Sequence, residues 1–361
     1  MEKETQRAEK EEVTRPCRGW LLLLAALLLS LPFPATAQQP LKLQLPTDNR
    51  ALFESRPESF YMYVYRTFEG ESSKPWQGGS YGFVRNLRRT EQGVVSTRFH
   101  EGIDIRPVKR DSAGRPVDDV RAIALGRVVY VQNSAGGSNY GRYLVVEHDW
   151  GQGPFLSLYA HLASAAVKEG QQVEAGHVLG RMGYTGAGIN RDRAHLHLEL
   201  NILLSLQFDD WHKMRFGSEN SHGIHNGMNL AGLDIARLFL NHHRDPATTL
   251  PAFLETEPVY YRVTCPRRGK LELADRYPWI RRGAHHRPSP SWEISFTASG
   301  FPLAIAPSHR EVSKPLITYV RTNQTRHEYF TLSRVTGTGQ RATLSKSGLL
   351  HLALITGEFG K

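Results

Sequence analysis

The sequence predicts a mainly β protein. Between residues 100 and 200, apolar and polar residues alternate with a period of two, which is typical of strands. Gly-rich turns separate these runs, as expected for antiparallel connections, and no long run has the helical period of 3.6 residues. The predicted strands are Ala122–Val131, Tyr143–His148, Phe155–His161, Val173–Met182 and Ala194–Leu200.

Residues 203–243 depart from this pattern. The apolar residues of Leu230–Phe239 recur with helical spacing, which predicts one amphipathic helix. Asn229 and Asp234 are expected at polar positions of that helix. We therefore expect a short helical insertion after the last predicted strand of the β block.

The C-terminal residues alternate again. The Pro-containing stretch 245–251 is typical of a linker. Residues 252–361 include the alternating runs Trp292–Phe296 and Pro315–Val320. This predicts a separate C-terminal β-sandwich-like domain of unknown role, with about the hundred residues that such domains commonly have.

The N-terminus has the features of an export signal. A charged stretch ending at Arg18 precedes the apolar run Gly19–Leu31, and Ala35–Ala37 offers a cleavage site. The apolar run is shorter than the ~20 residues of a membrane-spanning helix. Residues 1–37 are therefore predicted to be a signal peptide, with an uncleaved anchor as the alternative. Residues 38–80 are predicted to be a linker or lead-in, and whether they act as an inhibitory segment is open.

Cysteine usage and net charge limit the kinds of metal site and of binding partner that we expect. After cleavage Cys265 is the remaining cysteine, because Cys17 belongs to the leader, so neither an intramolecular disulfide nor a cysteine-based zinc cluster is expected. The formal net charge of +10 favours an acidic partner: nucleic acid, anionic lipid or an anionic polymer. We expect no nucleic acid, because the chain is exported and shows no basic-aromatic module. We also expect no stable membrane insertion after cleavage, which leaves an anionic envelope polymer.

Histidines and an aspartate recur in short motifs. The motifs are His100-Glu-Gly-Ile-Asp104, Tyr159-Ala-His161 and His195-Leu-His197. Two residues apart on a strand, His195 and His197 face the same side and offer two ligands, or a ligand and a base, to one point. A catalytic zinc site without cysteine uses three His or carboxylate ligands. Gly102 gives the backbone the freedom to bring His100 and Asp104 together.

In this order and spacing, residues 80–203 resemble the lysostaphin/LytM-type zinc metallopeptidases, which cut peptidoglycan cross-bridges. The Gly-rich hairpin from Val167 to Gly186 and the run Asn139–Gly141 also match. The resemblance implies an antiparallel β-sheet metallopeptidase core, similar to a duplicated hybrid motif, within residues 81–245. The insertion 203–243 is longer than the usual chain end of that family, so it is expected to reshape one wall of the groove.

The resemblance also implies the roles of the motif residues. It makes His100, Asp104 and His197 the ligands of one Zn²⁺ per chain, and His161 and His195 the catalytic pair that handles protons and the oxyanion. Which of these two histidines is the base is left open. The implied function is an exported zinc-dependent metalloendopeptidase. It would hydrolyse peptide bonds in peptidoglycan cross-links by attack of a zinc-activated water.

Alternatives to this function remain. Relatives that lost their zinc ligands activate a cell-wall amidase without catalysis, but no ligand is lost here. A zinc peptidase acting on a protein or peptide is a further possibility. The bond that is cut (D-Ala–diaminopimelate or a Gly-containing bridge) and the oligomeric state are not predicted. The location is expected to be periplasmic, envelope-associated or secreted.

Other polar residues have simpler interpretations. His148 and His177 are expected to be structural. A set of histidines in and near the insertion is expected to be solvated, with a second metal site as the alternative: His212, His222, His225, His242 and His243. Arg181, Arg191 and Arg193 are candidates for a basic rim around an anionic substrate.

Overall fold

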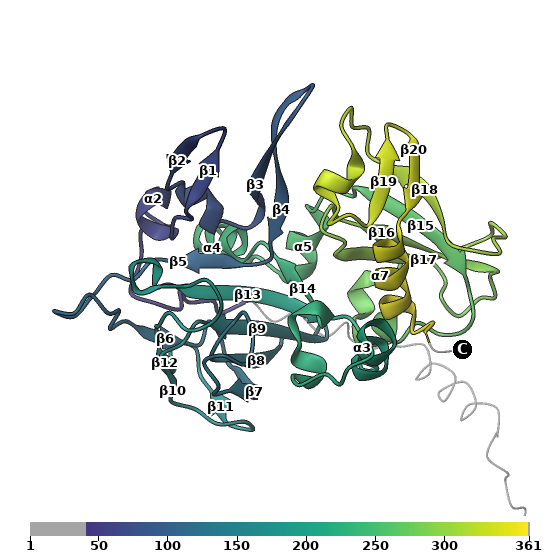
Figure 1. Cartoon of the computed structure of the whole chain (residues 1–361). Helices are drawn as coiled ribbons and strands as arrows, with labels where there is room; N and C mark the ends of the chain where they lie inside the picture. The colour runs from purple at the N-terminus through teal and green to yellow at the C-terminus, as the bar shows by residue number, and fades with distance from the viewer. Residues whose placement is uncertain (1–40, 360–361) are drawn as a thin grey trace, which may run out of the picture. The chain divides into compact units, whose positions relative to one another are not determined.

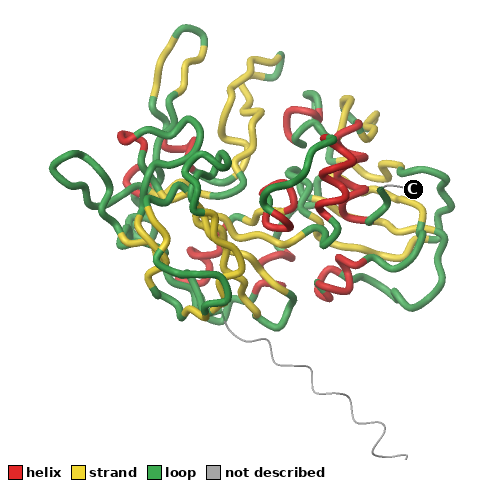
Figure 2. The backbone as a smooth tube through the Cα atoms, turned by 60° about the horizontal axis from the view of Figure 1, so that its bottom comes forward, coloured by secondary structure: helices red, strands yellow, loops and turns green. Residues whose placement is uncertain are grey.

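The computed structural model describes residues 41–359, which belong to one compact unit extending from Gln39 to Lys361. The predicted signal peptide 1–37, with Cys17, lies outside the described residues. Within the described range, strands and loops dominate and the helices are short (Figure 2). None of these helices is long and apolar enough to cross a membrane. The predicted mainly antiparallel β class is confirmed.

The largest sheet has seven strands and includes the strands of Asp104 and His197. Its order is β11-β7-β8-β9-β13-β14, β5 also pairs with β13, and every pairing is antiparallel. The strands are β5 (Ile103–Ile105), β7 (Gly126–Gln132), β8 (Tyr143–Asp149), β9 (Pro154–Ala160), β11 (Gln172–Val173), β13 (Leu196–Leu203) and β14 (Leu230–Leu233). In Figure 1, β13 runs through the middle of this sheet.

Smaller sheets surround it. One has the order β10-β12-β6, two are the hairpins β1-β2 and β3-β4, and the C-terminal sheets are β17-β16-β15-β18 and β19-β20. Before the insertion the strands are β1 (Arg66–Phe68), β2 (Glu71–Ser73), β3 (Gly82–Thr90), β4 (Gly93–His100), β6 (Asp119–Arg121), β10 (Ser164–Ala165) and β12 (Val178–Arg181). The C-terminal strands are β15 (Tyr261–Pro266), β16 (Ser291–Phe296), β17 (Pro302–Ser308), β18 (Leu316–Val320), β19 (Val335–Thr338) and β20 (Arg341–Leu344).

The helices lie mainly in the second half of the chain. They are α2 (Pro57–Phe60), α3 (Phe208–Phe216), α4 (Ile235–Arg244), α5 (Leu250–Glu255), α6 (Glu272–Arg276) and α7 (Lys346–Thr356). The 3-10 turns are η1 (Trp76–Gly79), η2 (Arg191–Arg193), η3 (Gly223–His225), η4 (Gly227–Asn229), η5 (Pro278–Ile280) and η6 (His327–Phe330).

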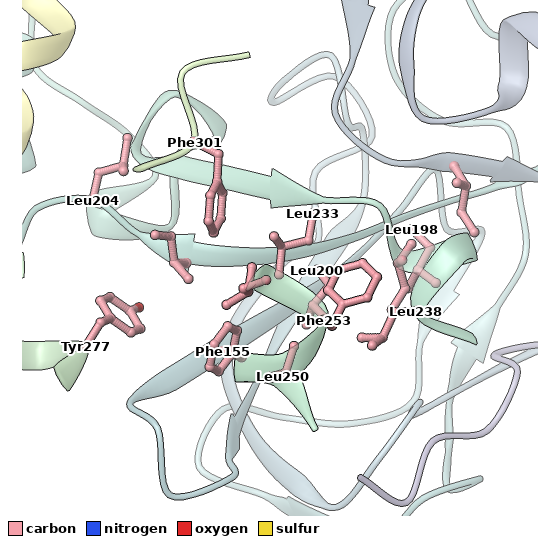
Figure 3. Close-up of a cluster of buried hydrophobic side chains, with 14 of the residues drawn as sticks. Phe155, Leu198, Leu200, Leu204, Leu233, Leu238, Leu250, Phe253, Tyr277 and Phe301 are labelled. Atoms are coloured by element: carbon pink, nitrogen blue, oxygen red, sulfur yellow. The ribbon is translucent and has the colours of Figure 1, made fainter. Parts of the chain in front are cut away.

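Alternation along β13 separates a core face from a polar face. Leu198 and Leu200 join the main hydrophobic cluster, where α4 and α5 contribute Leu238 and Phe253 (Figure 3). The alternate positions of the strand point to the opposite side, because successive side chains of a strand alternate. They are occupied by His197, Glu199 and Asn201, which are also fully or almost fully buried. The strand therefore holds its polar face rigidly against a large apolar core.

The predicted helix Leu230–Phe239 is wrong in its first part. Leu230–Leu233 is β14 and pairs with β13, and helix α4 begins only at Ile235. Asp234 caps that helix, accepting a hydrogen bond from the Arg237 backbone N–H at 3.0 Å. The short apolar run fits a strand as well as a helix, and periodicity alone does not distinguish them.

The segment from residue 41 to residue 80 packs on the peptidase core. Leu41, Leu52 and Phe60 are buried, and the Met62 backbone N–H donates to the Asp104 carbonyl at 2.7 Å. Tyr61 makes an isolated bridge to Ile105. Its packing ties this segment to the strand that carries Asp104.

The C-terminal residues form a four-stranded antiparallel sheet, a hairpin and helix α7. The β3–β4 hairpin stands beside this part (Figure 1), and Phe83 contacts Phe330 with ring centroids 6.3 Å apart. Tyr277 donates a hydrogen bond to the Pro154 carbonyl at 2.7 Å and accepts one from the Leu203 N–H at 2.9 Å. The separate domain that the sequence predicts for residues 252–361 stays a prediction.

Candidate metal centre and active site

Strand register brings the motif residues together. His197 on β13 lies opposite Asp104 of β5 on one side and Ala160 of β9 on the other. His161 directly follows β9, and His195 directly precedes β13. His100 is the last residue of β4, and its backbone leads within four residues to Asp104. All five predicted site residues are buried around one point.

Three of them present donor atoms at metal-ligand spacing. His100 Nε2 lies 3.1 Å from Asp104 Oδ1 and 3.1 Å from His197 Nδ1, and His197 Nδ1 lies 3.0 Å from Asp104 Oδ1. Tetrahedral zinc with bonds of about 2.0–2.1 Å separates its donors by roughly 3.3 Å, so the three atoms fit that ion. Among residues 41–359, no other group of histidine, cysteine or acidic side chains has such spacing.

Each candidate ligand is held by a further polar group. His100 donates from Nδ1 to the Ser80 carbonyl at 2.8 Å, which leaves Nε2 as the acceptor nitrogen. His197 donates from Nε2 to Glu199 Oε1 at 2.7 Å, which leaves Nδ1 facing the other ligands. Such outer partners orient ligands and raise the basicity of imidazoles in metal sites.

Glu199 is a site residue that the sequence analysis missed. It also accepts hydrogen bonds from Tyr140 Oη at 2.7 Å and Asn201 Nδ2 at 2.8 Å, so its carboxylate is fixed although buried. The available signal was its position two residues after His197, because that spacing places both side chains on one face of the strand.

Arg85 is a second missed residue. Its guanidinium donates to Asp104 Oδ2 at 2.6 Å, while Asp104 Oδ1 faces the histidines. Arg85 also donates to the Gly78 carbonyl at 2.7 Å. The arginine therefore orients the candidate carboxylate ligand, but it comes from the β3–β4 hairpin, and no motif in the sequence marks it.

His161 and His195 lie beside this cluster with their rings 4.8 Å apart. His161 donates from Nδ1 to the Thr185 carbonyl at 2.8 Å, and His195 donates from Nδ1 to the Arg193 carbonyl at 2.5 Å. Both Nε2 atoms are thereby left for the site, and that of His195 is 3.3 Å from Asp104 Oδ1. His161 has a φ of 61°, a strained value for a residue with a side chain, which is characteristic of functional sites.

The surroundings of Asp104 and of His161 shift the pKa of each. Burial raises the pKa of Asp104, but His100 and His195 outweigh it and hold that pKa well below its ordinary value. Burial and then the neighbouring His195 and His197 hold the pKa of His161 well below its ordinary value. These surroundings favour the neutral form of the His161 imidazole.

A cavity of about 880 Å³ opens above these residues. From the insertion, His222, Asn226 and two residues of η4 contribute to its wall, as a groove-lining insertion would. The wall outside the motifs is formed by Arg85, Arg98, Phe99, Glu101, Gly137–Tyr140, Tyr143, Ala187–Ile189, Arg193, His222 and Asn226–Met228. No residue from the described part of the predicted lead-in, 41–80, lines it.

The predicted basic rim is only partly at this cavity. Arg193 lines it, but Arg181 lines a different cavity and Arg191 lines neither. Arg193 donates to the Tyr63 carbonyl at 3.1 Å. The rim is instead completed by Arg85 and Arg98 of the hairpin.

The remaining histidines have individual partners. His148 bonds to the Leu125 carbonyl and to Ser157 Oγ, consistent with its structural interpretation. His222 bonds to Tyr130 Oη at 3.0 Å and lines the active cavity, whereas His225 stacks on Tyr130. Within the described residues, the insertion histidines form no second metal-type group.

Comparison with known proteins agrees with the motifs. The profile described as "Peptidase family M23" matches residues 98–207. "Lipoprotein NlpD" of Yersinia enterocolitica is 37% identical over 90 residues, which are 25% of this chain and 84% of that protein. "Murein hydrolase activator NlpD" of Salmonella dublin is 37% identical over 117 residues, 32% of this chain and 25% of that protein. The chain thus spans about a quarter of the length of this second relative.

A solved structure is also similar. The catalytic domain of the antimicrobial peptidase lysostaphin from Staphylococcus simulans is 21% identical, with a TM-score of 0.23. The match covers 40% of this chain and 83% of that domain.

Proposed function

Because the chain belongs to peptidase family M23, we propose that it is an exported zinc-dependent metalloendopeptidase that hydrolyses peptide bonds in peptidoglycan cross-links. The observation that carries the proposal is the complete set of three donor atoms, 3.0–3.1 Å apart, with two further histidines beside it. A site that had lost catalysis would be under no constraint to keep all five side chains in this arrangement.

His100 Nε2, Asp104 Oδ1 and His197 Nδ1 would hold one Zn²⁺ per chain. When bound, zinc supplies Lewis acidity, lowering the pKa of a water molecule to about 7 and polarising a peptide carbonyl. Arg85 and Glu199 would keep the aspartate and histidine ligands oriented.

His161 and His195 would carry out the proton transfers of the reaction. A neutral imidazole at His161 or His195 accepts a proton at Nε2 and later delivers it to the leaving amine. The other imidazole, in its protonated form, donates a hydrogen bond to the oxyanion that develops on the substrate carbonyl. Both rings use Nδ1 for a backbone carbonyl, so either Nε2 could serve in either role.

The partner and location follow from the same proposal. The substrate is a peptidoglycan peptide, and the net charge of +10 favours association with an anionic wall. The relatives named lipoprotein NlpD and the predicted signal peptide support an envelope location.

A second candidate is a non-catalytic activator of a cell-wall amidase. It is favoured by the name "Murein hydrolase activator" carried by relatives of 37% identity. The intact ligand set argues against it. A zinc peptidase with a protein or peptide target is the third candidate, since net charge does not determine specificity.

The test uses the purified full chain, zinc analysis and isolated sacculi. The proposal expects about one zinc per chain and release of cleaved cross-link peptides, identified by mass spectrometry, with both lost in His197→Ala. A second assay with added amidase distinguishes the amidase-activator hypothesis from the endopeptidase hypothesis. Amidase stimulation without any peptide product of the chain itself would overturn the proposal, and cleavage of a protein panel but not of sacculi would redirect it to the third candidate.

A further inference from the structure

A second cavity lies next to the active-site cavity and is lined in part by the C-terminal residues. Its volume is about 340 Å³. The two cavities share one wall, formed by Arg98, Phe99, Glu101, Gly227 and Met228. Its C-terminal lining comes from residues 299–301, Leu332, Arg334 and helix α7. The two cavities therefore lie next to each other, with these residues at their boundary.

The second cavity is cationic. Arg98, Arg215 and Arg334 line it, against the single carboxylate of Glu101. Among the described residues none of these three arginines forms an ion pair, whereas Arg85, which lines only the active cavity, is paired with Asp104. Guanidinium groups without an internal carboxylate are suited to bind one from a ligand.

Arg334 forms part of the wall of the second cavity. Its guanidinium donates to the Ser299 carbonyl. Gly300 allows this close approach, because a Cβ there would lie 2.5 Å from Arg334 Nη1. Burial and the proximity of Arg215 lower the pKa of Arg334, and burial followed by Arg334 holds the pKa of His351 well below its ordinary value. The local potential is therefore positive while His351 itself is neutral.

Apolar side chains lie beside these charges. Leu204, Trp211, Phe301 and Leu354 line the same cavity, and Figure 3 shows Leu204 and Phe301 on neighbouring segments. Trp211 donates from Nε1 to the Leu350 carbonyl at 2.9 Å, which ties α3 of the insertion to α7. Arg215 lies over the Trp211 ring at 5.0 Å. The lining thus combines an aliphatic and aromatic surface with cationic groups.

We propose that this second cavity is a substrate subsite that binds a carboxylate carried on an aliphatic part of the peptide, next to the bond that is cut. The inference rests on the proposed peptidase function and gives the insertion and the C-terminal part a shared role, since each supplies one of the arginines. Arg215 comes from the insertion, Arg334 from the C-terminal part, and Arg98 from the hairpin that also lines the active cavity.

The experiment compares two cross-linked stem-peptide substrates that differ only in having free or amidated carboxyl groups. The unmodified full chain is expected to prefer the free carboxylate in kcat/KM by about tenfold, which corresponds to about 1.4 kcal/mol. The double variant Arg98→Gln, Arg215→Gln is expected to lose most of this preference. The matched control is Arg88→Gln, Arg341→Gln, which removes the same charge from two exposed arginines outside both cavities and is expected to keep the preference.

A binding measurement keeps the inference separate from the proposed function. Uncrosslinked stem peptide, which has no cross-link to cut, is titrated calorimetrically into the same proteins in its free and amidated forms. Carboxylate-dependent binding without hydrolysis of any cross-link would support the subsite and overturn the peptidase. Hydrolysis with equal kcat/KM for both substrates, or an equal loss of preference in the control variant, would overturn the subsite and leave the peptidase standing.

Discussion

Two buried histidines of the same sheet have pKa values that are shifted in opposite directions. His197 on β13 faces Asp104 and Glu199, and their hydrogen bonds outweigh burial and raise its pKa to about 10. His148 on β8 faces a carbonyl, a hydroxyl and the ring of Trp150, and burial lowers its pKa to about 4. Burial alone therefore does not identify a ligand histidine. The carboxylates that face the ring distinguish the two residues.

The largest expected effect is the loss of metal in His197→Ala. We expect zinc content to fall from about one per chain to near zero, because only two ligands are left for an ion that needs three from the protein. Elemental analysis of the purified chain measures this. The control is His177→Ala, an exposed histidine whose loss should leave the zinc content unchanged. Full zinc content in His197→Ala would show that His197 is not a zinc ligand, and the contrast with His148 would then not identify ligand histidines.

Substitutions of His161 and His195 are expected to reduce catalysis without loss of metal. His161→Ala and His195→Ala should keep their zinc while kcat falls by about 10²–10⁴-fold, the usual contribution of a general acid or base. Activity and zinc are measured on the same samples. Because His195 Nε2 is 3.3 Å from Asp104 Oδ1, loss of zinc in His195→Ala would instead make it a ligand.

The neutral state of His148 predicts a pH-dependent stability. Its pKa is about 4 in the folded chain and 6.5 in the unfolded one, so the unfolded chain binds the proton first as pH falls. Stability is complete above pH 6.5 and declines toward pH 4, by about 3 kcal/mol for this group. Urea unfolding of the unmodified chain and of His148→Gln from pH 7 to pH 4 measures the difference. Parallel stability curves for the two proteins would contradict the assignment.

The smallest expected effect concerns the carboxylate behind His197. Glu199→Gln keeps a hydrogen-bond acceptor but removes the charge, and we expect zinc affinity to weaken by about 10–100-fold. Competition with a chelator measures this affinity. Tyr140→Phe removes only one of the donors to Glu199 and should weaken zinc binding less. An unchanged affinity in Glu199→Gln would reduce Glu199 to a structural residue.

Much of the fold follows from local patterning. The runs around residues 143–148 and 155–161 are strands within one residue of their predicted limits, because alternation is enforced by one face packing on the core. The predicted strand Val173–Met182 is instead divided into β11 and β12, since Gly176 adopts a φ of +82° in a turn between them. Leu230–Leu233 became a strand because β13 offered it an edge to pair with.

From the sequence alone, strand alternation places His195 and His197 on one side of a strand, and the resemblance carried by the motifs predicts that His100, Asp104 and His161 join them. Only the tertiary structure decided what surrounds them. Arg85 reaches Asp104 from a hairpin, and Arg98, Arg215 and Arg334 line one cavity although they lie far apart in the sequence. Such partners are selected by the packing of whole elements, which leaves no local pattern in the chain to predict them.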